Sequence, residues 1–262
     1  MVPSEYISEK GEKSSIIIDD PSVEIKENPT LILGFAGVGL LGPIIGNTMI
    51  DQIEDMKEIG FVTSAYLPPI SVFYDGVLKH PFRIFYSVKH NVILMICEVP
   101  FKISSAYNDL SKTICSWALS DVKVKDLLVF QGIPKKGMID EFPVFYAAQD
   151  PTVDHLEQKG VEKVEKGIIA GAEATILNEA LNNRIKPLAL FTPVYQIPTP
   201  EGAAAIIDVV NEIYDFNIDT SKLLKEGKKI KDRMMELAEK AQQYKRKQLQ
   251  DSGEEGYTQY YQ

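Results

Sequence analysis

Residues 30–46 read Thr-Leu-Ile-Leu-Gly-Phe-Ala-Gly-Val-Gly-Leu-Leu-Gly-Pro-Ile-Ile-Gly, and they indicate the fold class. Thr30–Ala36 is an apolar run with the length of one buried strand, and the glycines that follow mark a tight turn. Pro43 stands where the first turn of a helix tolerates proline. We therefore predict a strand, a glycine-rich turn and a helix that runs to about Met56.

The same stretch has to be tested as a membrane span, because Leu31–Ile50 is uncharged over about the length that a bilayer requires. Its glycines and proline crowd the centre, which favours a strand, a turn and a helix over one spanning helix. The first residues, Met1–Lys13, are rich in charge and lack the apolar core of a signal peptide. We expect a cytoplasmic protein with no membrane partner.

Strands and helices alternate along most of the chain. Further strands are expected at residues 16–18, 23–25, 60–66, 72–75, 82–88, 92–99, 126–131 and 187–192, and helices at 104–119 and 199–214. Residues 167–185 repeat the strand-turn-helix pattern, and Asp75-Gly76 predicts a tight turn. This alternation is typical of a mostly parallel sheet with helices on both faces. Residues 1–218 are therefore predicted to form one α/β domain.

The carboxyl-terminal part differs in kind. Residues 219–250 have an apolar seam at heptad spacing, which predicts a long amphipathic helix that packs on its own domain or on a sister subunit. Residues 251–262 begin with an acidic, glycine-containing linker and end in Tyr260-Tyr261-Gln262. Exposed aromatic side chains on a flexible tail suggest a docking peptide, with an inert tail as the alternative.

Charge and cysteine content exclude several classes of protein. The net charge of -9 argues against a nucleic-acid partner, which would require a basic face. Ten Lys or Arg residues do gather between Lys222 and Lys247, but a solvated helix face is the simpler interpretation of such a run. Cys97 and Cys115 lie in apolar surroundings without metal-binding spacing, so we expect two buried thiols and no metal site.

Gly37-Val38-Gly39-Leu40-Leu41-Gly42 matches the dinucleotide-binding pattern GxGxxG. The acidic residue that should end the second strand is missing, and a close-packed turn needs the same glycines. We assign a structural role to Gly34, Gly37, Gly39 and Gly42. Hydrolase motifs are absent and the three histidines fall in predicted turns, so we predict neither an enzyme nor a cofactor.

Several sequence blocks together resemble the proteasome assembly chaperone family in its archaeal branch. They are Gly34–Gly42, Leu67-Pro68-Pro69 with Asp75-Gly76, Cys97–Pro100, Phe130–Pro134 and Gly167–Gly171. The resemblance implies a phosphorylase-like three-layer α/β fold, no established catalytic activity and a homo-oligomer, for which we expect a tetramer or a pentamer.

The resemblance also implies action on the 20S proteasome core particle. Members that engage it end in a hydrophobic residue, a tyrosine and any residue, a pattern that Tyr260-Tyr261-Gln262 fits. The expected function is therefore an ATP-independent assembly chaperone or activator that docks this tail between α-subunits of the core particle. The alternative is a small-molecule or nucleotide binder, or an enzyme, that uses the loop at residues 37–42 on a phosphorylase-like fold.

Overall fold

A computed structural model describes residues 4–7, 13–20, 22–101, 104–149, 155–232 and 235. The chain divides into two compact units, Met1–Thr220 and Ser221–Gln262. In the second unit residues 221–232 are helical. Within the described residues, no helix has both the length and the apolar character needed to cross a bilayer.

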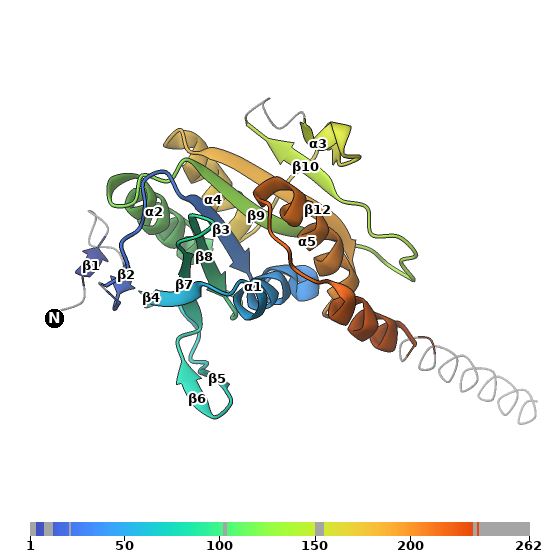
Figure 1. The fold of residues 1–262 in the computed structure, drawn as a ribbon, viewed down its shortest axis with the longest axis horizontal. Coiled ribbons are helices and arrows are strands. Elements are labelled where there is room, and N and C mark those ends of the chain that lie inside the picture. Colours follow the sequence, from blue (N-terminus) through green and yellow to red (C-terminus); the bar gives the residue numbers. More distant parts are fainter. Residues whose placement is uncertain are drawn as a thin grey trace, which may run out of the picture. The chain divides into compact units, whose positions relative to one another are not determined.

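A ten-stranded sheet forms the centre of the first unit (Figure 1). Its strands in chain order are β1 (Ser4–Ile7), β2 (Ser14–Ile18), β3 (Thr30–Phe35), β4 (Met56–Ser64), β7 (Phe82–Ser87), β8 (Val92–Cys97), β9 (Asp126–Pro134), β10 (Phe145–Ala148), β11 (Glu162–Lys163) and β12 (Lys186–Val194). Their spatial order is β1-β2-β4-β7-β8-β3-β9-β12-β10-β11. The buried strand predicted at Thr30–Ala36 thus lies in the interior of the sheet.

The predicted α/β class is confirmed, but the prediction of a mostly parallel sheet was wrong. Only β8, β3, β9 and β12 form a continuous parallel core. The pairs β1-β2, β2-β4, β4-β7, β7-β8 and β10-β12 are antiparallel. The connection from β7 to β8 is only a short turn, which can join antiparallel strands but leaves no room for the crossover that parallel strands need.

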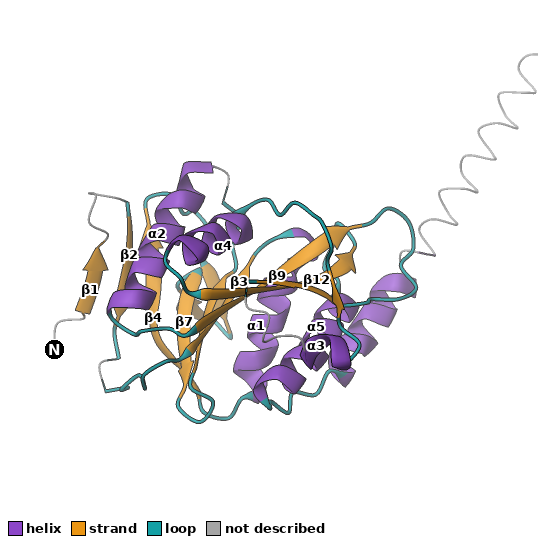
Figure 2. Cartoon of the chain, turned by 90° about the horizontal axis from the view of Figure 1, so that it is seen from above, coloured by secondary structure: helices purple, strands orange, loops and turns teal. Residues whose placement is uncertain are grey.

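Helices cover both faces of the sheet. They are the short 3-10 helix η1 (Val38–Leu40) and the α-helices α1 (Leu41–Gln52), α2 (Ser104–Ser120), α3 (His155–Gln158), α4 (Ala172–Asn182) and α5 (Pro200–Tyr214). Figure 2 shows α2 and α4 on one face and α1 with α5 on the other. Helix α1 ends before the predicted Met56, because Ile53 adopts an extended backbone with φ -82° and ψ 106°.

Some predicted strands are absent and some observed strands were not predicted. Residues 23–25 and 167–171 carry no strand, although Val23, Ile25 and Ile169 still pack against the core from loops. Their apolar pattern reflects burial and not strand pairing. The strands β1, β10 and β11 lie toward the two edges of the sheet, where short segments leave a weak pattern.

A separate hairpin consists of β5 (Val72–Tyr74) and β6 (Val77–Lys79). Asp75 and Gly76 both have positive φ, 49° and 78°, which is the geometry of the tight hairpin turn that the sequence predicted. The hairpin follows β4 and precedes β7 in the chain, and Figure 1 shows it projecting away from the main sheet.

Candidate functional site

The glycine-rich turn joins β3 to α1 through η1, and its backbone is packed tightly against the protein. A Cβ added to Gly34 would lie 2.7 Å from the carbonyl oxygen of Gly42, and one added to Gly42 would lie 2.5 Å from the backbone of Phe35. Strand and helix therefore approach each other through two residues without side chains. A side chain at either position would force the start of α1 away from β3.

Gly39 is constrained twice. Its φ is +76°, which disfavours side chains, and a Cβ there would lie 2.7 Å from the Cβ of Val194 in β12. Gly132 in β9 is crowded in the same way, since its Cβ would lie 2.5 Å from the carbonyl oxygen of Val38. The turn thus fits between the ends of β9 and β12. Close packing by itself accounts for glycine at positions 34, 39 and 42.

Gly37 differs, because it lines a small cavity. The cavity holds about 140 Å³ and lies beyond the carboxyl end of β3, where ligands commonly bind in α/β sheets. Its polar lining includes Glu173 and Gln131. Pockets for drug-sized ligands usually span roughly 300–1,000 Å³. The cavity is therefore smaller than a nucleotide requires, and the alternative of a nucleotide site at residues 37–42 gains no support from it.

Glu173 is the most perturbed acid of this cavity. It occupies the first turn of α4, and its side chain is only 5% exposed. Burial raises the pKa of its carboxyl from 4.5 to about 7, because charge is poorly solvated there. The Oε1 atom of Gln131 is buried without a hydrogen-bond partner. Both groups can accept hydrogen bonds, so the cavity suits ordered water or a small hydrogen-bond donor.

The other reactive groups do not extend this site. Burial raises the pKa of the Cys97 and Cys115 thiols to about 12 in each case, which leaves them protonated and unreactive. Across the ranges that the structure describes, no three His, Cys, Asp or Glu side chains come together as a possible metal site.

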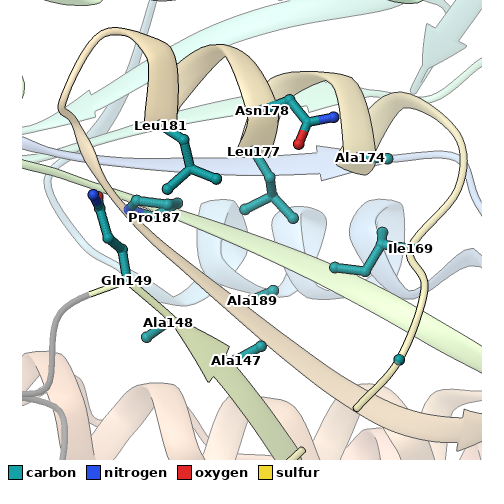
Figure 3. Close-up of a pocket in the computed structure, with 11 residues that line it drawn as sticks. Ala147, Ala148, Gln149, Ile169, Ala174, Leu177, Asn178, Leu181, Pro187 and Ala189 are labelled. Carbon is teal, nitrogen blue, oxygen red and sulfur yellow. The ribbon is translucent and has the colours of Figure 1, made fainter.

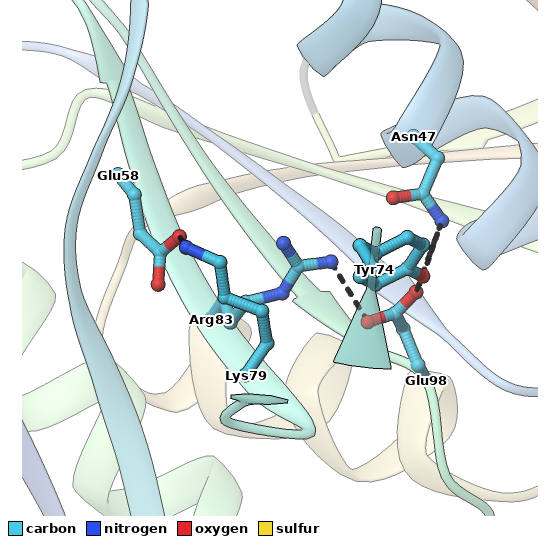
Figure 4. Close-up of polar contacts among 6 residues, drawn as sticks. All are labelled: Asn47, Glu58, Tyr74, Lys79, Arg83 and Glu98. Carbon is cyan, nitrogen blue, oxygen red and sulfur yellow. Dashed lines mark hydrogen bonds and ion pairs between the residues drawn. The ribbon is translucent and has the colours of Figure 1, made fainter. Parts of the chain in front are cut away.

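A buried polar network lies at the base of the β5–β6 hairpin (Figure 4). Arg83 and Glu98 form an ion pair at 2.8 Å, and both side chains are more than nine-tenths buried. Glu98 also accepts hydrogen bonds from Asn47 of α1, at 3.0 Å, and from the Tyr74 hydroxyl. The Arg83 guanidinium lies 5.0 Å from the centre of the Tyr74 ring. This network ties the hairpin to β7 and to α1.

The predicted tail residues Tyr260, Tyr261 and Gln262 lie outside the described residues, as do residues 236–250 of the predicted helix. Sequence reasoning missed Glu173 and the Arg83–Glu98 pair. For the pair a signal existed: Arg83 interrupts an apolar strand, and Glu98 directly follows another. A charge inside a buried strand usually has a partner on a neighbouring element.

Comparison with known proteins places the chain among relatives of known structure. PbaA of Pyrococcus furiosus, an archaeal homologue of proteasome-assembly chaperone, is 26% identical with a TM-score of 0.75, over 94% of this chain and 100% of that chain. PbaB of the same organism, an archaeal proteasome activator, also has a TM-score of 0.75 at 15% identity, over 87% and 99% of the two chains, and this match shows the fold alone.

Among curated sequences, the uncharacterized protein MJ0106 of Methanocaldococcus jannaschii is 28% identical over 216 residues, which are 81% of this chain and 87% of that protein. The model of the PAC2 family matches residues 31–238, most of the chain. The family resemblance found in the sequence is thereby confirmed. The chain belongs to the PAC2 family.

Proposed function

We propose that this protein is an ATP-independent binding protein of the 20S proteasome core particle, acting as an assembly chaperone or an activator. The observation that carries the proposal is the match to PbaA over 94% of this chain and the whole of that chain. PbaB, a proteasome activator, has a similar fold, which agrees with a role at the proteasome. The thiols of Cys97 and Cys115 are buried and protonated, so neither is available as a nucleophile.

The contact with the core particle is assigned to Tyr260, Tyr261 and Gln262. The terminal carboxylate pairs with a lysine between two α-subunits, while the two tyrosines fill the adjoining pocket, a form of carboxylate recognition. Residues 251–259 supply a linker that reaches at most about 30 Å. The sequence has no Walker motif for ATP hydrolysis, so any opening of the gate draws on binding energy alone.

A single tail of this kind binds weakly, and several tails on one homo-oligomer bind together. The high effective concentration of the remaining tails raises avidity by about 10² to 10⁴ when the linkers reach their pockets. The proposal therefore combines a cytoplasmic homo-oligomer, with four or five subunits, and one docking tail per subunit.

The test measures binding to immobilised core particle by surface plasmon resonance. Tyr261→Ala and deletion of Gln262 should each weaken the binding free energy by about 2 kcal/mol or more per tail, because each removes an anchor from a desolvated pocket. An extra residue after Gln262 displaces the carboxylate and should do comparable harm, whereas Gln262→Ala retains it and should be mild. Thr258→Ala, in the linker, is the matched control and should leave binding unchanged.

Hydrolysis of a fluorogenic peptide by the core particle, measured in parallel, distinguishes an activator from an assembly factor. Undiminished binding after removal of Tyr260, Tyr261 and Gln262 would refute the docking mechanism. In that case the basic residues between Lys222 and Lys247 become the next surface to test.

A further inference from the structure

The β5–β6 hairpin presents large apolar side chains to solvent. Phe73 is 69% exposed and Leu78 is 74% exposed, and the two residues are direct partners across the hairpin. Direct partners lie on one face, where their side chains touch. Val77, which pairs with Tyr74 on the other face, and Ile70, which precedes the hairpin, are exposed as well. Single exposed apolar residues are ordinary, but a pair of large ones opposite each other on a projecting element marks an interaction site.

The hairpin is held firmly enough to act as a docking element. Tyr74, next to Phe73, donates a hydrogen bond to Glu98, and Lys79 pairs with Glu58 at 2.8 Å. Side chains alternate between the faces of a strand, so Phe73 and Leu78 lie on the face opposite Tyr74. The anchored face thus holds the hairpin to the body while the other face points outward. Such preorganisation lowers the entropy cost of binding.

An apolar groove of about 350 Å³ lies on the same unit, between α4 and the strands β10 and β12. Figure 3 shows Leu177 and Leu181 of α4 beside Ala147 and Ala189 of the strands. The small alanine side chains leave space under the two leucines. Leu181 is 43% exposed, and Ile168, close to the groove in the chain, is 98% exposed. The apolar surface therefore extends beyond the groove itself.

Hairpin and groove belong to different regions of the sheet. The hairpin connects β4 to β7, whereas the groove lies over β12 and β10, near the other end of the strand order. Figure 1 shows the hairpin projecting on the side away from α4 and β10. A projecting apolar element and an apolar hollow on separate surfaces of one chain permit a head-to-tail contact between copies, which forms a ring when its rotation closes.

Residues of opposite charge lie beside the two apolar surfaces. The hairpin turn carries Asp75, and the groove is flanked in sequence by Lys166, next to the lining residue Gly167, and by Lys186, next to the lining residue Pro187. Both lysines are exposed. Complementary charge of this kind sets orientation and disfavours wrong pairings. The net charge of -9 makes unspecific association of copies unfavourable, so a matched contact is needed.

We propose that Phe73 and Leu78 of one copy insert into the groove between α4, β10 and β12 of a second copy, with Asp75 facing Lys166 and Lys186. Repetition of this contact closes a ring of identical subunits. The inference rests on the homo-oligomer of the proposed function and names the contact that would build it, and it is tested without the proteasome. Failure of tail docking would leave this contact standing, and a ring held by another contact would leave tail docking standing.

The first experiment measures the mass of the full chain by light scattering after size exclusion. Leu78→Glu and Leu181→Glu should each convert the wild-type ring to monomer, since both place a charge in the contact. Phe73→Ser is a second hairpin variant and should act in the same direction. Val88→Glu is the matched control, an exposed apolar residue outside both surfaces, and should keep the wild-type mass. Equal circular dichroism spectra verify folding.

The second experiment tests the pairing directly by cross-linking with a short bismaleimide. Cys97 and Cys115 are buried, so introduced thiols react alone. Leu78→Cys with Leu181→Cys in one chain should give a ladder of covalent oligomers, and either substitution alone should give none. A monomeric wild-type chain, a Leu78→Glu variant of wild-type mass, or a covalent dimer from Leu78→Cys alone would each overturn the proposal.

Discussion

Replacement of Glu173 by glutamine should stabilise the protein at neutral and alkaline pH. The carboxyl is 5% exposed, and burial raises its pKa to about 7, whereas 4.5 is the ordinary value. Between these two values the unfolded chain carries an ionised carboxylate while the folded chain retains the proton. Stability therefore falls by about 1.4 kcal/mol for each pH unit in this window, which totals about 3 kcal/mol.

Below pH 4.5 the carboxyl is protonated in both states, so Glu173→Gln should hardly change the free energy of unfolding. Above about pH 7 the wild type bears the full cost of a buried charge, and the variant should be more stable by about 3 kcal/mol. The unpartnered Oε1 of Gln131, which lines the same cavity, offers an acceptor that the new amide can use.

The assay is urea denaturation of wild type and variant at intervals between pH 4.5 and 8.5, followed by circular dichroism. Comparison of the two proteins at each pH cancels all other titrating groups. Glu54→Gln removes the same charge at an exposed position of the same unit and should give a small, constant difference. A constant difference for Glu173→Gln across this range would mean that the carboxyl ionises normally in the folded protein, contrary to this prediction.

Three further predictions concern packing and burial. Gly39→Ala should lower the free energy of unfolding, measured by chemical denaturation, by about 2–4 kcal/mol, because it adds a clash with Val194 to the strain of positive φ. The control Gly76→Ala, at φ +78° with nothing within 4 Å of its Cβ, should lower it by about 1 kcal/mol. Equal costs would contradict this role of Gly39. Glu98→Ala should lower the free energy of unfolding by about 3–5 kcal/mol, because it leaves the buried Arg83 charge unpaired. Glu212→Ala, at a surface pair, should lower it by less than about 1 kcal/mol. A small effect of Glu98→Ala would argue against a stabilising role of the network. Neither cysteine of the native chain should react with Ellman's reagent at pH 8, and both should react in denaturant; fast reaction of the native protein would show that the thiols are accessible.

The sequence predicted those parts of the fold whose cause is local. The strand at Thr30–Phe35 is apolar because both of its faces are buried, and the turn at Asp75-Gly76 follows from two residues that tolerate positive φ. Strand direction is not visible in the apolar runs, which look alike in parallel and antiparallel strands. It follows from the length of the connection, and the few residues between β7 and β8 leave room only for an antiparallel pair.

The site was harder to predict than the fold. Glu173 has the appearance of an ordinary acidic residue in the first turn of a helix, and its burial depends on residues far away in the chain, such as Gly37 and Gln131, that line the same cavity. The glycine motif suggested a ligand, yet Gly39 and Gly42 meet protein atoms and not open space. The exposed apolar group around Phe73 reads as an ordinary alternating strand, because exposure depends on where the hairpin projects.

The two proposals assign different tasks to different parts of the chain, and this separation has a physical basis. In the proposed function, Tyr260, Tyr261 and Gln262 bind the core particle, and several tails on one oligomer bind more tightly than one. Repetition requires a subunit contact that does not use those residues, and the β5–β6 hairpin with the groove beside α4 offers one within the first unit. Loss of the hairpin contact should therefore leave each tail with its own affinity and remove only the avidity, about 10² to 10⁴. Loss of the tail should leave the ring intact and remove the affinity itself, so the two variants differ in mass even where both bind poorly.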